Sequence, residues 1–347
     1  MELGIGLDAS LNLSFEEQAQ ISMEAARFGY TSIWTPEGTG HDGFQICINR
    51  WLGTREVVPG GLTTGIAVSP VALRTPVALA MGAGTVSQLT GGRFILGIGS
   101  GALHTQSGRA TYGMGRFSVI GLMREYLTSL RGLLAGDEVT HEGDTVVIRG
   151  VRLAVEPPPR TPVYLGALGP EMLRLGGEFA DGIALNWCMP EQIAWSRDRI
   201  AEGAARLGRD PASVKVVEYI RVCIDDDEQL ARRSFTRAML GYALGRPDAP
   251  ARERGTGYRA HFDRMGFANE LARLDAMRAA GAPEEELVDA FPEELARRVG
   301  YYGPAEGAAD ALGALSEGLD VAIVRVVPAR PGLDAVEATM RACAPAV

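Results

Sequence analysis

The sequence predicts an α/β fold in which eight strands alternate with helices and close into a barrel. Eight short apolar runs, each followed by a segment with helical spacing, recur along the 347 residues. Repeated strand-then-helix units indicate a parallel sheet with helices outside it. No linker divides the chain, and barrels of this length occur as one domain. The expected fold is therefore a (β/α)8 TIM barrel with insertions, spanning residues 1–347 as a single domain.

The first part of the chain contains three strand–helix units with clear boundaries. Ser14 and Glu17 form the capping-box pattern that starts a helix, and Gly29 ends that helix. Thr75 followed by Pro76 is a second favoured helix start. We expect strands at 3–7, 30–35 and 62–69, and helices at about 14–28, at 44–57 and from 76 to the glycine pair at 91–92.

The stretch 85–101, TVSQLTGGRFILGIGSG, has two interpretations. Gly97, Gly99 and Ala102 fit the G-x-G-x-x-G/A dinucleotide pattern. That pattern normally opens a helix directly, whereas we expect a long polar loop at 103–117. We therefore favour a fourth barrel strand at 93–98, with glycines after it that let a ligand approach the backbone.

The second half continues the alternation with two interruptions. A helix at 119–134 is closed by Gly136, and a β-hairpin insertion follows at 138–155. An Arg-, Gly- and Pro-rich segment with short amphipathic helices, 246–302, is expected as an insertion at the barrel mouth. The remaining strands are expected at 163–166, 182–187, 214–224 and 321–327, with helices starting near 170 and at 190–207, 304–315 and 333–342.

Composition restricts the function classes. The chain is 46% hydrophobic and 22% charged with a net charge of -9, so nonspecific nucleic-acid binding is not expected. Its four cysteines are widely scattered and form no zinc-ligand pattern, which predicts reduced thiols in a cytoplasmic protein and no metal site. We also expect no signal peptide and no membrane span.

Four stretches carry a resemblance to a known family. They are SIWTPE with the HDGF loop behind it, residues 67–101 from AVSP to GIGSG, residues 162–187 from PVYLGALGPE to ALNW, and residues 291–312 from FPEELARR to ADAL. The chain resembles the bacterial luciferase-like flavin and deazaflavin oxidoreductases, most closely the branch that uses coenzyme F420. The resemblance covers nearly the whole chain and implies a TIM barrel with an interrupted wall.

Three alternative functions are open for a chain with this resemblance. The first is an oxidoreductase that transfers a hydride between F420 and a small organic substrate. The second is an FMN-dependent monooxygenase fed reduced flavin by a partner reductase. The third is a barrel that binds a flavin-like ligand without turnover, in which side chains would block the pocket. A homodimer is expected because family members commonly dimerise.

Candidate site residues lie at the carboxyl ends of the strands, where barrel active sites are built. By resemblance, Glu37 stands where family members often carry an acid beside the ring, and His41 or Asp42 in the same loop could relay a proton. Sugar-phosphate dehydrogenases of the family carry a glutamate where this chain has Ala102. That substrate class is therefore not favoured, and the proton is expected from Glu37, His41, Asp42 or His104.

The expected cofactor contacts come from five strand ends. By resemblance, the third strand end bulges against the ring, often with a non-proline cis bond, and the loop after the fifth strand binds the cofactor phosphate. The candidate residues are Asp8; Ile66, Ala67, Val68 and Ser69; Gly99, Ser100 and Gly101; Gly166, Ala167, Leu168, Gly169 and Pro170; and Asn186 and Trp187.

Overall fold

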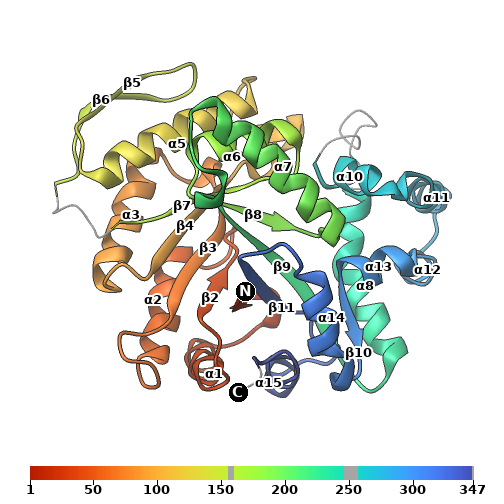
Figure 1. The fold of residues 1–347 in the computed structure, drawn as a ribbon. Coiled ribbons are helices and arrows are strands. Elements are labelled where there is room, and N and C mark those ends of the chain that lie inside the picture. Colours follow the sequence, from red (N-terminus) through yellow and green to blue (C-terminus); the bar gives the residue numbers. More distant parts are fainter. Residues whose placement is uncertain (155–159, 246–256, 346–347) are drawn as a thin grey trace.

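The computed structural model describes residues 1–154, 160–245 and 257–345, and it contains the predicted closed barrel (Figure 1). All neighbouring barrel strands pair in parallel, and the last pairs with the first. In spatial order the strands are β1 (Glu2–Gly6), β2 (Ser32–Thr35), β3 (Thr63–Pro70), β4 (Phe94–Gly99), β7 (Val163–Gly166), β8 (Gly182–Asn186), β9 (Lys215–Ile224) and β11 (Val321–Val326).

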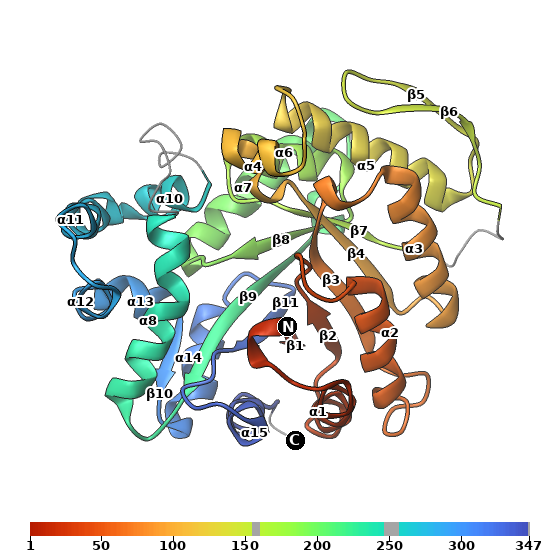
Figure 2. The ribbon, with the colours of Figure 1, turned by 180° about the vertical axis from the view of Figure 1, so that it is seen from behind.

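Helices surround the barrel on its outer face (Figures 1 and 2). Those that follow successive strands are α1 (Phe15–Arg27), α2 (Gly43–Thr54), α3 (Pro76–Leu89), α5 (Val119–Ala135), α6 (Pro170–Phe179), α7 (Pro190–Arg206), α8 (Glu228–Leu244), α14 (Ala308–Leu315) and α15 (Leu333–Ala342). The insertion after α8 adds α10 (Gly257–Phe262), a π-helical turn η5 (Asp263–Phe267), α11 (Ala268–Ala279), α12 (Glu284–Asp289) and α13 (Glu293–Val299).

The helix boundaries follow the local sequence signals. Ser14 and Glu17 form a complete capping box at the start of α1, as predicted. The Thr75 side chain accepts a hydrogen bond from the Ala78 N–H, with Pro76 as the first helical residue of α3. Gly136 ends α5 with a φ of 84°, a left-handed conformation that favours glycine. These boundaries are set by short-range chemistry, so they are visible in the sequence.

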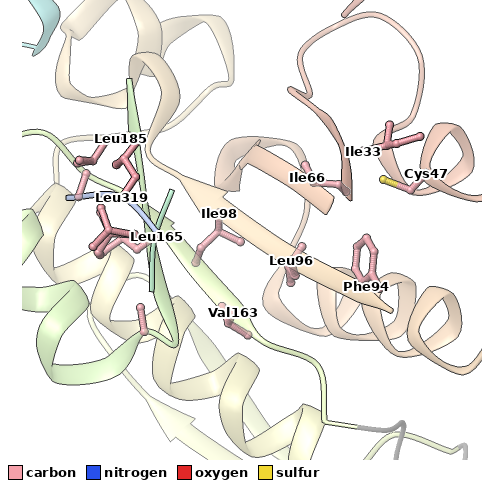
Figure 3. Packing of buried hydrophobic residues seen from close by; sticks show 14 of the residues in the cluster. Ile33, Cys47, Ile66, Phe94, Leu96, Ile98, Val163, Leu165, Leu185 and Leu319 are labelled. Atoms are coloured by element: carbon pink, nitrogen blue, oxygen red, sulfur yellow. The ribbon is translucent and has the colours of Figure 1, made fainter. Parts of the chain in front are cut away.

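Two hydrophobic layers hold the barrel together. On β4, the side chains of Phe94, Leu96 and Ile98 point outward and pack in the core under the helices (Figure 3). A smaller cluster that includes Trp34 and Tyr164 lies inside the barrel. Because side chains alternate along a strand, the inward positions of β4 after Ile95 are Gly97 and Gly99. The inner face of β4 therefore carries no side chain beyond Ile95.

Two segments differ from the sequence-based expectations. The loop expected at 103–117 is partly ordered, with a 3-10 turn η3 (Gly101–His104) and a short helix α4 (Gln106–Thr111) begun by the Thr105 cap. A strand β10 (Gly300–Gly303) pairs with the end of β9 outside the barrel, inside the segment expected to be helical. The predicted hairpin is present as β5 (Val139–Glu142) and β6 (Val147–Val151). The part of the expected insertion at 246–256 lies outside the described residues.

Within the described part of the chain, no helix combines the length and apolarity needed to cross a membrane. Cys47, Cys188, Cys223 and Cys343 are all buried free thiols.

The packing of α6 against α7 generates a stability prediction. A Cβ placed on Gly203 of α7 would lie 1.9 Å from the carbonyl oxygen of Arg174 in α6, and neither backbone can move away freely. We expect Gly203→Ala to lower the free energy of unfolding by about 1–3 kcal/mol or more, measured by chemical denaturation.

The matched control is Gly241→Ala in α8, where nothing lies within 4 Å of an added Cβ. Alanine should stabilise that exposed helix position by up to about 1 kcal/mol. Equal effects of the two substitutions would contradict the close approach of α6 and α7.

Candidate functional site

A cavity of about 570 Å³ lies at the carboxyl ends of the barrel strands. Its lining residues come from strand ends, from η3 and the starts of α5 and α6, and from α8, α10 and η5. Of the predicted site residues, those that line it are Glu37, Ala67, Val68, Gly99, Ser100, Gly101, His104, Gly166, Ala167, Leu168, Gly169, Pro170 and Asn186. This space remains open between its walls, whereas the third alternative expected side chains to block it.

The end of β3 forms one wall of the cavity. The peptide bond between Ala67 and Val68 is cis, and the pairing of β3 with β4 shifts register between Ile66 and Ser69. The expected backbone irregularity is therefore present at the predicted residues. Ala67 and Val68 face the cavity, whereas Ile66 packs in the outer core and Ser69 is buried beneath the wall.

Glycines on the neighbouring strands accommodate this bulge. A Cβ on Gly97 would lie 2.2 Å from the carbonyl oxygen of Ile66, and one on Gly99 would lie 2.5 Å from Cγ2 of Val68. A Cβ on Gly166 of β7 would be 3.2 Å from Cγ1 of the same valine. The glycine run of β4 thus makes room for β3, in addition to lining the cavity at Gly99.

The start of α6 also lines the cavity. Gly169 is the N-cap residue, and no side chain caps the helix. The first N–H groups of a helix have no partner within the helix, and their dipoles favour an anion. On the insertion, Arg264 donates a hydrogen bond to the Leu168 carbonyl oxygen at 2.9 Å, which brings a cation to this loop.

Glu37 lines the cavity but is held by four hydrogen bonds. Its carboxylate accepts from the Gly43 N–H at 2.7 Å, from Ser69 Oγ at 2.5 Å, and from both terminal nitrogens of Arg74 at 2.6 and 2.7 Å. The side chain is 1% exposed. These contacts connect the β2 end to the β3 bulge, so the structure gives Glu37 a positioning role, while proton transfer by it remains a prediction.

The other three candidate acids lie in different places. Asp42 caps α2 and pairs with Arg74, and His41 is exposed against the Phe15 ring with 4.9 Å between ring centroids. Neither lines the cavity. His104 does line it, with Nδ1 3.1 Å from the Gly101 carbonyl oxygen. Of these three, the structure brings His104 alone to the cavity.

Asp8 reaches the cavity indirectly, through Arg325. Arg325 lies on β11, and its Nε is 2.7 Å from the Asp8 carboxylate at the end of β1. Burial acts to raise the pKa of Asp8, but the charge of Arg325 and hydrogen bonds from Ser10 outweigh burial and lower that pKa. The guanidinium centre also lies 5.3 Å from the Tyr219 ring centroid. Arg325 is thus a charge-balanced side chain at the cavity wall.

Asn186 faces the cavity, whereas the neighbouring Trp187 does not. Trp187 is fully buried, has a φ of 58°, and stacks under the Arg221 guanidinium at 3.7 Å. It packs with the insertion, in the cluster that includes Phe235. Trp187 therefore supports the wall and does not contact the cavity.

Several lining residues are absent from the sequence-based candidates. Among them are five polar or aromatic side chains: Tyr219, Tyr242, Tyr258, Arg264 and Arg325. Arg325 had a usable signal, because it is the single charge in the apolar run 321–327, near its carboxyl end. The tyrosines of α8 and α10 had none, since no strand-end position marks them.

Comparisons with known proteins agree with the barrel fold. The profile of the family described as "Luciferase-like monooxygenase" matches residues 4–320. A 5,10-methylenetetrahydromethanopterin reductase of Methanolobus tindarius is 29% identical, covering 88% of both chains. A putative coenzyme F420-dependent oxidoreductase of Mycobacterium tuberculosis is 25% identical, covering 85% of this chain and 86% of its own. The solved F420-dependent tetrahydromethanopterin reductase of Methanopyrus kandleri superimposes with a TM-score of 0.75 at 20% identity, covering 98% and 96% of the chains.

A buried carboxylate supports the cavity wall from behind. Glu218 of β9 is 1% exposed, and its Oε1 accepts a hydrogen bond from the Cys188 N–H at 2.6 Å. Its other oxygen has no partner among the described residues. Burial raises the pKa of Glu218 to about 8. The bond holds the backbone just after Asn186 and Trp187.

This raised pKa predicts a pH-dependent stability. The unfolded glutamate loses its proton near its ordinary pKa of 4.5, whereas the folded one keeps it up to about 8. Glu218 should therefore make the wild type lose stability relative to Glu218→Gln as pH rises from 5 to 8, by on the order of 3 kcal/mol. Because glutamine has no proton to lose, the unfolding free energy of Glu218→Gln should rise relative to that of the wild type between pH 5 and 8.

Glu178→Gln is the control. Burial acts to raise the pKa of Glu178, but Arg206 and Arg124 outweigh it and hold that pKa low. This variant should differ from the wild type by a constant amount between pH 5 and 8. Parallel curves for Glu218→Gln and the wild type would contradict the assignment to Glu218.

Proposed function

Because this chain belongs to the luciferase-like monooxygenase family, we propose that it is an oxidoreductase that transfers a hydride between coenzyme F420 and a small organic substrate. One observation carries the proposal. A single cavity joins an uncapped helix N-terminus, suited to a phosphate, to a bulged apolar strand end, suited to one face of a flat ring. The names of the relatives favour F420 as the cofactor.

The residues of the cavity fit such a cofactor in two parts. The backbone N–H groups at the start of α6 would hold the phosphate, with the guanidinium of Arg264 close by. Ala67 and Val68 would support one face of the ring, beside the open backbone of Gly99. When bound, F420 accepts or supplies a hydride at the position-5 carbon of its deazaflavin ring.

The remaining task of the chain is to orient the reactants and exclude water. The cavity is also lined by Tyr242 of α8 and by Tyr258 and Ala260 of the insertion. The Glu37–Arg74 pair fixes the bulge from beneath, because it ties the β2 end to Ser69. The ring would therefore meet a rigid wall on one side, with room for a substrate on the other.

The second candidate is an FMN-dependent monooxygenase, which the family description itself suggests. Titration of the protein with F420 and with FMN, followed by tryptophan fluorescence, separates the two. We expect micromolar binding of F420 and weaker binding of FMN. Micromolar FMN binding without a response to F420 would reject the F420 proposal.

Gly169 offers a test of the phosphate position. Its φ is -91°, and nothing lies within 4 Å of an added Cβ, so a small side chain is tolerated there. An aspartate would cap α6 and stabilise the helix, but its charge would repel a phosphate at the same N–H groups. We expect Gly169→Asp to weaken F420 binding by about tenfold or more, without loss of thermal stability.

Gly169→Asn is the matched control, because it caps the helix without a charge. It should weaken F420 binding much less than the aspartate does. Equal affinities of the two variants would place the phosphate elsewhere.

A further inference from the structure

Three polar side chains form a hydrogen-bonded chain that ends at the cavity. Arg221 of β9 donates through Nη1 to the side-chain oxygen of Asn186 on β8. Asn186 then donates through Nδ2 to the hydroxyl oxygen of Tyr258 on α10, at 2.6 Å. Asn186 and Tyr258 line the cavity, while Arg221 is 2% exposed behind them. Through Asn186, these two hydrogen bonds join strands β8 and β9 to the insertion.

The chemistry of the groups fixes the direction of both bonds. A guanidinium can only donate, so the atom of Asn186 that faces Arg221 is the amide oxygen. The amide nitrogen, which can only donate, therefore faces Tyr258. The hydroxyl oxygen of Tyr258 must accept this bond, and its proton is left to be donated elsewhere. Within the described part of the chain, no hydrogen bond uses that proton.

The surroundings keep the proton on Tyr258. Its ring packs edge-on against Tyr242, with 4.7 Å between centroids. Burial raises the pKa of Tyr258 to about 12, so its hydroxyl is protonated throughout the working range. For Tyr242 burial acts in the same direction, but the charges of Arg221 and Arg325 outweigh it and lower the pKa. Of the two tyrosines, Tyr258 is the one held as a donor.

We propose that Tyr258 is a catalytic residue that donates its hydroxyl proton to the carbonyl oxygen of the substrate, and that Arg221 and Asn186 position it. The inference rests on the proposed function and narrows the substrate class to ketones and aldehydes. An already cationic acceptor, such as an iminium, would need no proton from the protein.

The step balances as follows. The carbonyl carbon forms a C–H bond with the hydride from reduced F420, and the π electrons of the C=O bond move to oxygen. That oxygen takes the proton of Tyr258, which gives an alcohol, oxidised F420 and a tyrosinate. Reduced F420 gives up a proton as well as the hydride when it is oxidised; that proton passes to solvent water at the cavity mouth, and the solvent returns a proton to the tyrosinate. Alcohol oxidation is the same step reversed.

The test uses two probes of equal shape on the protein loaded with oxidised F420. Acetophenone carries a C=O group where α-methylstyrene carries C=CH2. The ratio of their dissociation constants therefore measures how much a hydrogen bond to the carbonyl oxygen contributes to binding. We expect Tyr258→Phe to raise the dissociation constant of acetophenone about tenfold relative to that of α-methylstyrene. With reduced F420, the same variant should reduce acetophenone at least about 100-fold more slowly.

Asn186→Asp tests the direction of the bonds. A carboxylate of the same size can only accept, so it would turn the Tyr258 proton away from the cavity. We expect the same shift in the probe ratio as for Tyr258→Phe. Tyr301→Phe is the matched control, because that hydroxyl donates to the Pro304 carbonyl at 2.6 Å outside the cavity lining. It should leave the ratio unchanged.

F420 affinity, measured first in each variant, separates the two levels of the proposal. No F420 binding by the wild type would reject the proposed function. If F420 binds normally, two results would overturn the role of Tyr258. One is a wild-type protein that binds both probes equally well, and the other is a probe ratio that Tyr258→Phe leaves unchanged. An unchanged ratio in Asn186→Asp alone would overturn the positioning role of Asn186.

Discussion

The close approach of the β3 bulge to its neighbours is the constraint on which the cavity depends. The carbonyl oxygen of Ile66 and the side chain of Val68 occupy the space where β4 would otherwise carry side chains at 97 and 99. Glycine at both positions is therefore a steric requirement of the fold. Since these are inward positions of the barrel, the requirement also leaves the interior open beside the bulge. One local irregularity thus creates both a wall and the space in front of it.

The cavity divides into two halves with different origins. The ends of β3 and β4 and the loop after β7 are largely backbone and apolar, which suits a flat ring and a phosphate. The other half is polar and comes from β8, β9, β11 and the insertion. There Asp8 balances the charge of Arg325, while Arg221 donates a hydrogen bond to the neutral amide of Asn186. A cofactor and a polar substrate would each find a complementary surface.

The sequence predicted what depends on neighbours along the chain. The capping box at Ser14, the Thr75-Pro76 start and the eight strands are local patterns, and they were confirmed. Strand β10 was missed because it forms by pairing with the end of β9, which no local pattern encodes. The glycines of β4 were interpreted as clearance for a ligand; Gly97 and Gly99 also accommodate the β3 bulge, which the sequence did not indicate. Tyr258 was missed because the role proposed for it depends on Asn186 and Arg221, which lie 72 and 37 positions away in the sequence.

A crystal structure of the chain with oxidised F420 tests these assignments most directly. We expect the cofactor phosphate at the first N–H groups of α6 and one face of the deazaflavin against Ala67 and Val68. The hydroxyl of Tyr258 should then face the opposite side of the ring, across the space left for a substrate. A phosphate bound away from α6, or a ring that does not contact the β3 bulge, would contradict the account.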